Sequence, residues 1–216
     1  IGSSAASDVY KRQNSQWLAS LHGFGWLRHI CALSTQRGPT AAAFYVQDWI
    51  RRNPVRQKEA MRPDVTARRL MNWSAAMPTI LPALERREID AIRQALSQQS
   101  KYLAGCIDEE SDGVRRLTAA FGLAYAGLAF SGDGQWVRQG VEAILRELRR
   151  QLLADGGHVS RSPTILADIL NHMIALEAAM QTRGVQVPAT LMETRKRMQA
   201  MVALICHSDG GLGLFN

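Results

Sequence analysis

The feature that most constrains the fold of this chain is a helical spacing of apolar residues that recurs along most of its length. Between Ala83 and Ile107, for example, Ile89, Ile92 and Leu96 follow one another by three and four residues. This period places them on one face of an α-helix. No segment alternates apolar and polar residues as a half-buried strand does. The pattern therefore predicts an all-α fold.

Breaks rich in glycine and proline divide the chain into about eight predicted helices. Seven of them are expected at residues 15–31, 41–52, 83–107, 117–130, 137–152, 163–182 and 188–205, and another opens at Arg62-Pro63-Asp64. Gly38-Pro39-Thr40 is expected to interrupt the helical pattern, and Asp64 to cap the helix after it. Residues 117–130 are apolar or small on all sides, which indicates a central buried helix. Short connections favour antiparallel helical hairpins.

Length and composition set the class of protein. The 216 residues allow one large domain or two small ones, and no apolar run is long enough for a transmembrane helix. Three widely spaced cysteines indicate free thiols in a reducing compartment, with neither a disulfide framework nor a zinc site. The net charge of +7 is carried mostly by arginine. It fits an anionic partner, such as nucleic acid, an acidic polysaccharide or membrane headgroups, and equally a solvated basic surface.

The two ends of the chain differ from the rest. Residues 1–13 are polar and aperiodic, and we interpret them as a non-native or disordered extension, which leaves 14–216 as one helical domain. The chain stops at residues 211–216 without a closing helix, which indicates C-terminal truncation. No signal peptide is visible, so the compartment stays open between cytoplasm and periplasm.

A short loop between two strongly helical segments carries the most suggestive polar groups. Asp155-Gly156-Gly157 is typical of a helix end, and Ser162-Pro163 of a helix start. Between them lie His158, which titrates near neutral pH, and Arg161, a fixed cation. Such a loop could present both groups to a ligand, or it could be a simple turn with two polar residues.

The order of motifs along residues 14–216 resembles the N-terminal helical domain of the heparinase II/III-like polysaccharide lyases, in particular a bacterial subgroup. The loop just described, placed after a long helix, is the most specific part of the likeness. The other matching pieces are Leu21 to Arg28, Arg62 to Val65, Ala67 to Trp73, Gln99 to Leu103, Leu123 to Phe130 and Asp209 to Leu212.

This resemblance implies an incomplete (α/α) toroid, followed in complete proteins by a β-sandwich domain that this fragment lacks. It implies β-elimination at a uronic acid of an acidic, glycosaminoglycan-like polysaccharide, without a cofactor or metal. In that reaction a polar group offsets the carboxylate charge, and a tyrosine or histidine removes the C5 proton. On this resemblance, polysaccharide is a more fitting partner than nucleic acid or a membrane, and the missing β-sandwich is a further partner.

Two positions depart from the pattern of active lyases. Those enzymes open a helix with an asparagine–histidine pair, where residues 112–117 of this chain contain neither residue type. They also carry a tyrosine and a histidine shortly after the Ser-Pro pair, where this chain has Ile165 and Leu166. Neither side chain can transfer a proton, so the resemblance leaves catalysis open.

The candidate site residues follow from the loop and the resemblance, and each also has a structural interpretation. His158 is the candidate catalytic base or acid, or else it bonds a helix end. The candidate substrate-binding residues, which could instead be surface, capping or core groups, are Arg161, Arg115, Arg116, Arg69 and Trp73.

The positions of the arginines separate the two functional hypotheses. A lyase-like cleft predicts Arg68 or Arg69, Arg115 or Arg116, and His158 with Arg161 on one concave face. A non-enzymatic scaffold for nucleic acid predicts instead a basic stripe on an outer helix face, at Arg138, Arg146, Arg149 and Arg150. His22 and His29 are seven residues apart but have no third ligand nearby, so no metal site is predicted.

Overall fold

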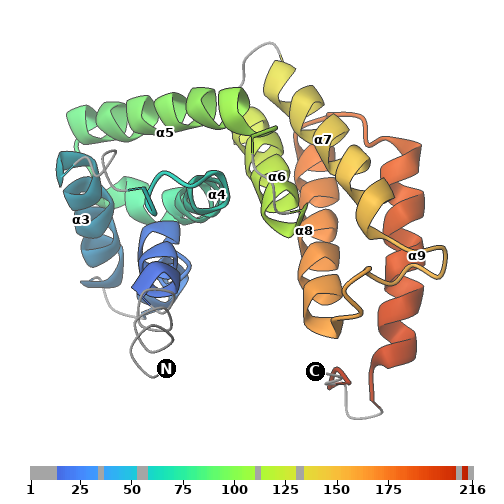
Figure 1. Ribbon diagram of the computed structural model, residues 1–216. Coiled ribbons are helices and arrows are strands. Elements are labelled where there is room, and N and C mark those ends of the chain that lie inside the picture. Colours follow the sequence, from blue (N-terminus) through green and yellow to red (C-terminus); the bar gives the residue numbers. More distant parts are fainter. Residues whose placement is uncertain are drawn as a thin grey trace, which may run out of the picture.

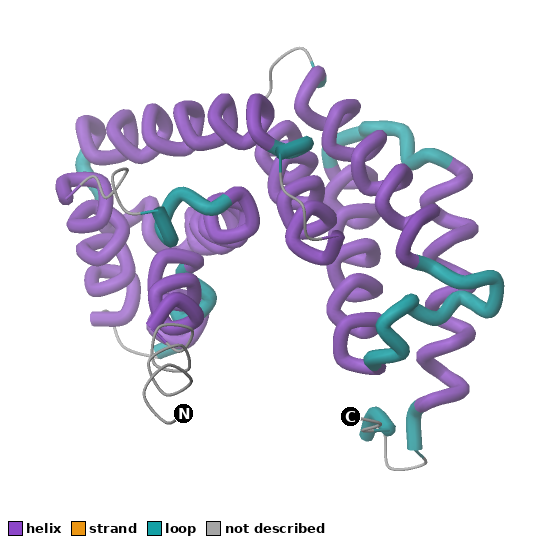
Figure 2. The backbone as a smooth tube through the Cα atoms, in the orientation of Figure 1, coloured by secondary structure: helices purple, strands orange, loops and turns teal. Residues whose placement is uncertain are grey.

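The computed structural model describes residues 14–33, 37–52, 58–109, 113–129, 134–207 and 211–213. The predicted extension at residues 1–13 therefore lies outside the described residues. Within them the structure is helical, and no strand is present beyond two isolated bridges (Figure 2). The all-α prediction is confirmed. Among the described residues, no helix combines the length and apolar character that a membrane span needs.

The first half of the chain forms a group of helices around an aromatic core. A helix over residues 14–23 turns at residues 24–26 into α2, so the helix expected at 15–31 is divided at Gly23 and Gly25. The following elements are α2 (Leu27–Cys31), α3 (Arg37–Arg52), α4 (Pro63–Ile80), the 3-10 helix η2 (Leu81–Ala83) and α5 (Arg86–Cys106). Helix α4 packs against α2, α3 and α5, so it organises this group.

The second half is built from helices joined by short connections. Its elements are α6 (Gly113–Ala129), α7 (Gln135–Gln151), α8 (Pro163–Thr182) and α9 (Ala189–Ile205). Helix α6 packs against α4, α7 and α8, and it lies between the two groups of helices (Figure 1). Ten of its residues are buried, which confirms the predicted central helix. The arrangement is that of an incomplete α/α toroid.

Small residues allow α6 to approach its neighbours closely. A methyl group added to Gly122 of α6 would overlap the Cβ of Ala67 on α4. One added to Gly140 of α7 would lie 2.6 Å from the backbone nitrogen of Ala124. No real Cβ atom tolerates such contacts without a backbone shift. The run of alanine and glycine in this segment is therefore a requirement of packing.

The start of α8 and the loop before it follow the sequence prediction. Ser162 is the N-cap, and its hydroxyl accepts a hydrogen bond from the backbone N–H of Ile165. An antiparallel bridge joins Leu152 to His158 across the Asp-Gly-Gly turn. A second isolated antiparallel bridge, between Cys206 and Leu212, follows α9. The same type of bridge thus follows α7 and α9.

Two local predictions are wrong. Residues 38–40 do not interrupt the helical pattern, because α3 already begins at Arg37 and contains Pro39 in its first turn, where proline loses no hydrogen bond. Asp64 is not the cap of α4. The N-cap is Arg62, and Asp64 is buried in the first turn, where it accepts hydrogen bonds from the Arg62 side chain at 3.1 and 2.9 Å.

Candidate functional site

His158 is part of the fold's internal hydrogen-bond network. The backbone N–H of Ser160 donates to its Nδ1 at 3.1 Å, so Nε2 carries the proton and donates to Oε1 of Gln151, also at 3.1 Å. The Gln151 amide is oriented in turn, because its Nε2 donates to the carbonyl of Gly113 at 2.8 Å. His158 is buried and burial lowers its pKa. Both ring nitrogens serve structure, which favours the structural interpretation of this residue.

Arg161 is held by its own loop. Its guanidinium donates to Asp155 at 2.9 Å, and the Asp155 carboxylate also accepts from the backbone N–H of Gly157. The bond from Gly157 and the Arg161 guanidinium together hold the pKa of Asp155 below its usual value. The Arg161 side chain is 66% exposed, and its backbone has a left-handed φ of 57°. It lies beside a small groove next to α9, with His158.

Arg115 and Arg116 begin α6 on the side away from the main cavity. Arg116 donates to the buried carboxylate of Glu147 on α7 at 3.1 Å, and that carboxylate also accepts from Arg150. Arg115 is exposed. Neither arginine lines the main cavity, because the turn of the helix places Val114 and Leu117 there instead.

Arg69 and Trp73, two of the candidate substrate-binding residues, are completely buried, which favours their alternative interpretation as core groups. Trp73 packs edge-on against Phe24 and Trp49, with ring centroids 5.3 Å away in each case. Burial lowers the pKa of Arg69 to about 9, which leaves it charged at neutral pH. Its guanidinium lies 4.2 Å above the Trp49 ring and donates to Gln99, to Thr66 and to the carbonyls of His22 and Ala60. Arg69 therefore fastens several segments together.

The main cavity lies between α6 and α8 on one side and α2 and α4 on the other, and it has a volume of about 660 Å³. Helices α6 and α8 each contribute residues at the i, i+3 and i+4 spacing that defines one helix face, and α4 contributes a pair at i and i+4. Its polar and aromatic lining is formed by Ser20, Trp26, Arg28, His29, Arg68, Asn72, Thr118, Phe121, Asp168 and His172. The predicted concave face that gathers Arg68 or Arg69, Arg115 or Arg116, and His158 with Arg161 is not formed, because only Arg68 of this set lines the cavity, and His158 and Arg161 lie at another groove.

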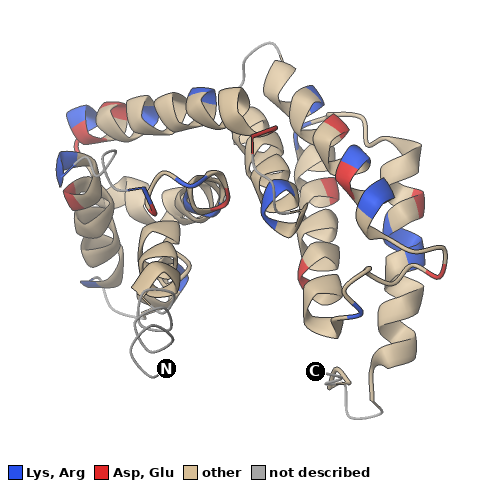
Figure 3. Ribbon diagram, in the orientation of Figure 1, with Lys and Arg blue, Asp and Glu red and all other residues tan. Residues whose placement is uncertain are grey.

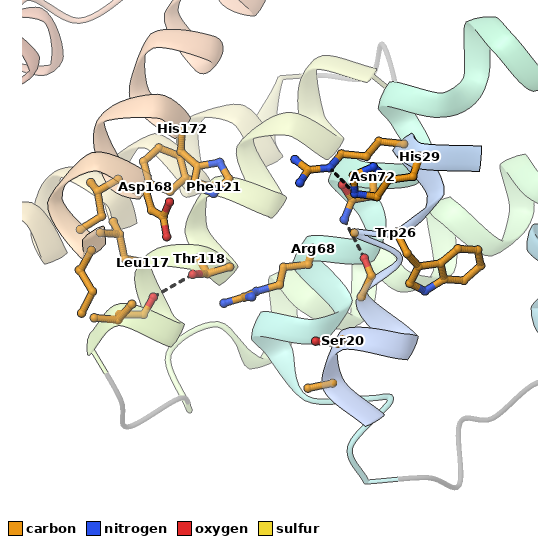
Figure 4. Close-up of a pocket in the computed structure, with 17 residues that line it drawn as sticks. Ser20, Trp26, His29, Arg68, Asn72, Leu117, Thr118, Phe121, Asp168 and His172 are labelled. Carbon is orange, nitrogen blue, oxygen red and sulfur yellow. Dashed lines mark hydrogen bonds between the residues drawn. The ribbon is translucent and has the colours of Figure 1, made fainter. Parts of the chain in front are cut away.

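Helix α4 supplies Arg68 and Asn72, one turn apart. Arg68 is exposed, and its guanidinium extends into the middle of the cavity (Figure 4). It makes no hydrogen bond or ion pair with any other described residue. Asn72 is fixed, because its Nδ2 donates to the carbonyl of Gly23 at 2.8 Å. The adjacent arginines 68 and 69 therefore have opposite roles, one facing the cavity and the other within the core.

Helix α8 supplies Asp168 and His172 on the opposite wall. The His172 ring stacks on Phe121 with centroids 5.3 Å apart. Burial is the main cause that lowers the pKa of His172, Arg68 acts in the same direction, and Asp168 opposes them. The imidazole is therefore neutral at pH 7. Neither side chain makes a hydrogen bond to a described residue, so both retain their capacity to bind a ligand.

The remaining wall comes from α2 and the turn before it. The Arg28 guanidinium donates to Nε2 of His29 at 3.3 Å, and both side chains are exposed. Trp26 lies at the end of the cavity away from Asp168 and His172 (Figure 4). Within the described residues, no group of three histidine, cysteine or acidic side chains could hold a metal ion. The lining thus offers two guanidinium groups, two imidazoles, a carboxylate, an amide and two aromatic rings.

A family model described as heparinase II/III N-terminus matches residues 32–216. The chain belongs to this family. This heparinase-type domain has the fold of heparan sulfate lyase HepC from Pedobacter heparinus, with a TM-score of 0.71 and 19% identity over 89% of this chain and 32% of that one. Heparinase III gives a TM-score of 0.68 and 16% identity over 88% of this chain and 31% of that one.

A curated relative carries a different kind of name. FtsZ-localized protein C of Caulobacter vibrioides is 25% identical over 201 residues, which cover 93% of this chain and 34% of that protein. The chain therefore spans about a third of the length of the proteins it matches.

The family resemblance located the cavity of this heparinase-type domain better than it located the residues. Val114 and Leu117 fall in the segment where active lyases carry the asparagine–histidine pair, and Ile165 where they carry the tyrosine; all three line the cavity. The polar groups lie elsewhere on the same walls. On α8, Asp168 and His172 follow Ile165 at helical spacing, a signal visible in the sequence as two polar residues on an apolar face.

Proposed function

We propose that this domain binds a uronate-containing acidic polysaccharide, with one acidic unit in the cavity between α4 and α8. The observation that carries the proposal is the set of polar groups there that the fold leaves unused. The side chains of Arg68, Asp168 and His172 face one open space and make no hydrogen bond to a described residue. Membership of the heparinase II/III family supports a polysaccharide as the ligand.

Each wall has a chemical part in this binding. A guanidinium fork matches a carboxylate or sulfate group, so Arg68 pairs with the acidic substituent. Asn72 is held through its Nδ2, which leaves its carbonyl oxygen to accept from a sugar hydroxyl. Trp26 provides an apolar face at the end of the cavity. The net positive charge of the chain attracts a polyanion.

β-Elimination in this cavity needs a proton acceptor, which the apolar Ile165 cannot provide. His172 is the described lining residue that fits, because its lowered pKa keeps the imidazole neutral. It takes the C5 proton of the uronate, the C5–H electron pair forms the C4–C5 double bond, and the bond from C4 to the leaving oxygen breaks. The imidazolium then returns the proton to that oxygen. Arg68 stabilises the charge that develops on the carboxylate.

The test uses a panel of uronate oligosaccharides and two matched variants. Arg68→Ala removes the guanidinium in the cavity, and Arg149→Ala removes an equally exposed one from the end of α7. We expect Arg68→Ala to weaken binding in calorimetry by about tenfold or more, the loss typical of a charge-assisted hydrogen bond, and Arg149→Ala to leave it unchanged. Ultraviolet absorbance of unsaturated uronate products reports elimination. Equal oligosaccharide affinities in the two variants would contradict the proposal.

A non-catalytic scaffold for an anionic partner is the second candidate. The name of the Caulobacter relative, FtsZ-localized protein C, favours a role at FtsZ over turnover of a polysaccharide. Nucleic acid is less favoured as its ligand. The basic residues along α7 are visible in Figure 3, but two of them, Arg146 and Arg150, are paired with Asp108 and Glu147. Binding to purified FtsZ that Arg68→Ala leaves intact, without any oligosaccharide binding, would support the scaffold.

A further inference from the structure

The cavity is continuous with a line of aromatic rings that leads to the surface. Trp26, which lines the cavity, contacts Tyr45 of α3 edge-to-face, with ring centroids 5.4 Å apart. Tyr45 in turn contacts Phe44 edge-to-face at 5.6 Å. In Figure 4, Trp26 lies at the end of the cavity away from His172 and Asp168, with Arg68 between them. The three rings therefore form a row that begins at the cavity and ends at the exposed Phe44.

Tyr45 and Phe44 are not needed to fill the core, unlike Trp26, which packs against it. Tyr45 is 45% exposed and Phe44 is 55% exposed. Helix α3 packs on the protein through other residues, among them Ala42, Ala43 and Val46, which are buried. Adjacent large apolar side chains on a surface commonly mark a place where another molecule binds.

Charge at both ends of this line indicates an anionic occupant. The Arg51 guanidinium lies 5.7 Å above the Phe44 ring, and its side chain is 59% exposed. Its contact with Asp48 is long, at 3.5 Å, so an incoming anion competes with it easily. Arg28 and Arg68 provide cations at the cavity end. A purely apolar protein surface would gain nothing from these cations, whereas a chain of acidic sugars uses both rings and cations.

We infer that Trp26, Tyr45 and Phe44 form an aromatic extension that binds additional sugar units of the same acidic polysaccharide whose first unit occupies the cavity. The inference rests on the proposed function and adds the path of the polymer. The C–H faces of sugar rings pack on the aromatic rings, and Arg51 pairs with an acidic substituent. Affinity then increases with the length of the oligosaccharide.

The experiment compares a uronate disaccharide with a hexasaccharide by calorimetry. For the unaltered chain we expect the hexasaccharide to bind about tenfold more tightly, the gain of one or two aromatic contacts. The double variant Phe44→Ala/Tyr45→Ala should lose this gain and keep the disaccharide affinity. Tyr45→Phe, which keeps the ring, should retain it. Ile174→Ala, which truncates an exposed apolar residue of α8, is the matched control.

The possible outcomes separate the two proposals. A length gain that persists in the double variant overturns the aromatic extension and leaves the proposed function standing. So does a wild-type dimer in sedimentation that the double variant abolishes without any effect of sugar length, because the rings then bind a second copy. Absence of disaccharide binding, or binding that Arg68→Ala does not change, overturns the proposed function and the extension together.

Discussion

The loop after α7 and the cavity between α4 and α8 each hold an imidazole and a guanidinium, and the fold treats the two pairs differently. In the loop, both ring nitrogens of His158 are bonded and Arg161 is paired with Asp155. In the cavity, the side chains of His172 and Arg68 make no hydrogen bond to a described residue. The comparison shows that residue type alone does not mark a site. What distinguishes the cavity is that the fold leaves the side chains of Arg68, Asp168 and His172 without a hydrogen-bond partner among the described residues.

The largest effect we predict is a difference in stability between variants of two adjacent arginines, Arg69 in the core and Arg68 in the cavity. Arg69→Ala removes hydrogen bonds to four buried acceptors and should lower the free energy of unfolding by about 3 kcal/mol or more. Arg68→Ala should change it by less than about 0.5 kcal/mol, because the side chain is exposed. Denaturant unfolding measures both. Arg69→Lys keeps the charge but not the forked guanidinium, so it should recover only part of the stability that Arg69→Ala loses. A comparable loss in Arg68→Ala would contradict the assignment of Arg68 to the cavity.

The two histidines give the next prediction. His158→Ala leaves Oε1 of the buried Gln151 without its donor and should cost about 2 kcal/mol of stability. His172→Ala loses mainly the stacking on Phe121, about 1 kcal/mol. For oligosaccharide affinity the order should reverse, with His172→Ala the weaker binder. If His172→Ala proved the more destabilising variant and bound sugar normally, the structural role assigned to His158 and the binding role assigned to His172 would both be wrong.

The sequence was sufficient for the fold but only partly for the site, and the reason is physical. Helix period, the Ser162–Pro163 start and the small residues of α6 are local properties, and each predicted its element correctly. Whether a polar side chain has a partner depends on residues far along the chain. Arg69 bonds Gln99, thirty residues away, and nothing near either residue in the sequence indicates this.

The family resemblance filled part of this gap. It directed attention to the start of α6 and to Ile165, which do line the cavity. It could not indicate Asp168 and His172, because its pattern places the functional groups at positions that are apolar in this chain. Helical spacing from Ile165 along α8 was the signal available in the sequence for finding them.

The effect of pH on stability sharpens the comparison further. Burial lowers the pKa of both His158 and His172 from the ordinary 6.5. As pH falls through 6.5, the imidazoles take up protons in the unfolded chain but not in the folded one, so stability should decrease until the folded pKa is reached. Each pKa unit by which the folded value lies below the unfolded value corresponds to about 1.4 kcal/mol of stability. Unfolding midpoints across this range measure the loss, and His158→Gln should reduce it.

Ligand binding should distinguish the same two imidazoles. An acidic sugar in the cavity adds negative charge next to His172 and should raise its pKa, while His158 lies outside the cavity and should keep its value. Nuclear magnetic resonance titration of both rings, with and without a uronate disaccharide, follows each residue separately. Equal shifts for both rings would indicate a general change in the fold and would count against a ligand in this cavity.

The smallest effect concerns the backbone of Arg161. Its φ of 57° costs a residue with a Cβ about 1–2 kcal/mol, whereas glycine adopts it freely but loses about 0.5–1 kcal/mol of chain entropy on folding. Arg161→Gly and Arg161→Ala both lose the exposed ion pair to Asp155, so their difference isolates the backbone. Arg161→Gly should be more stable than Arg161→Ala by about 0.5–1 kcal/mol. Neither variant should change sugar affinity. A loss of sugar affinity in both Arg161 variants would show that Arg161 belongs to the binding site, and the contrast between loop and cavity would no longer hold.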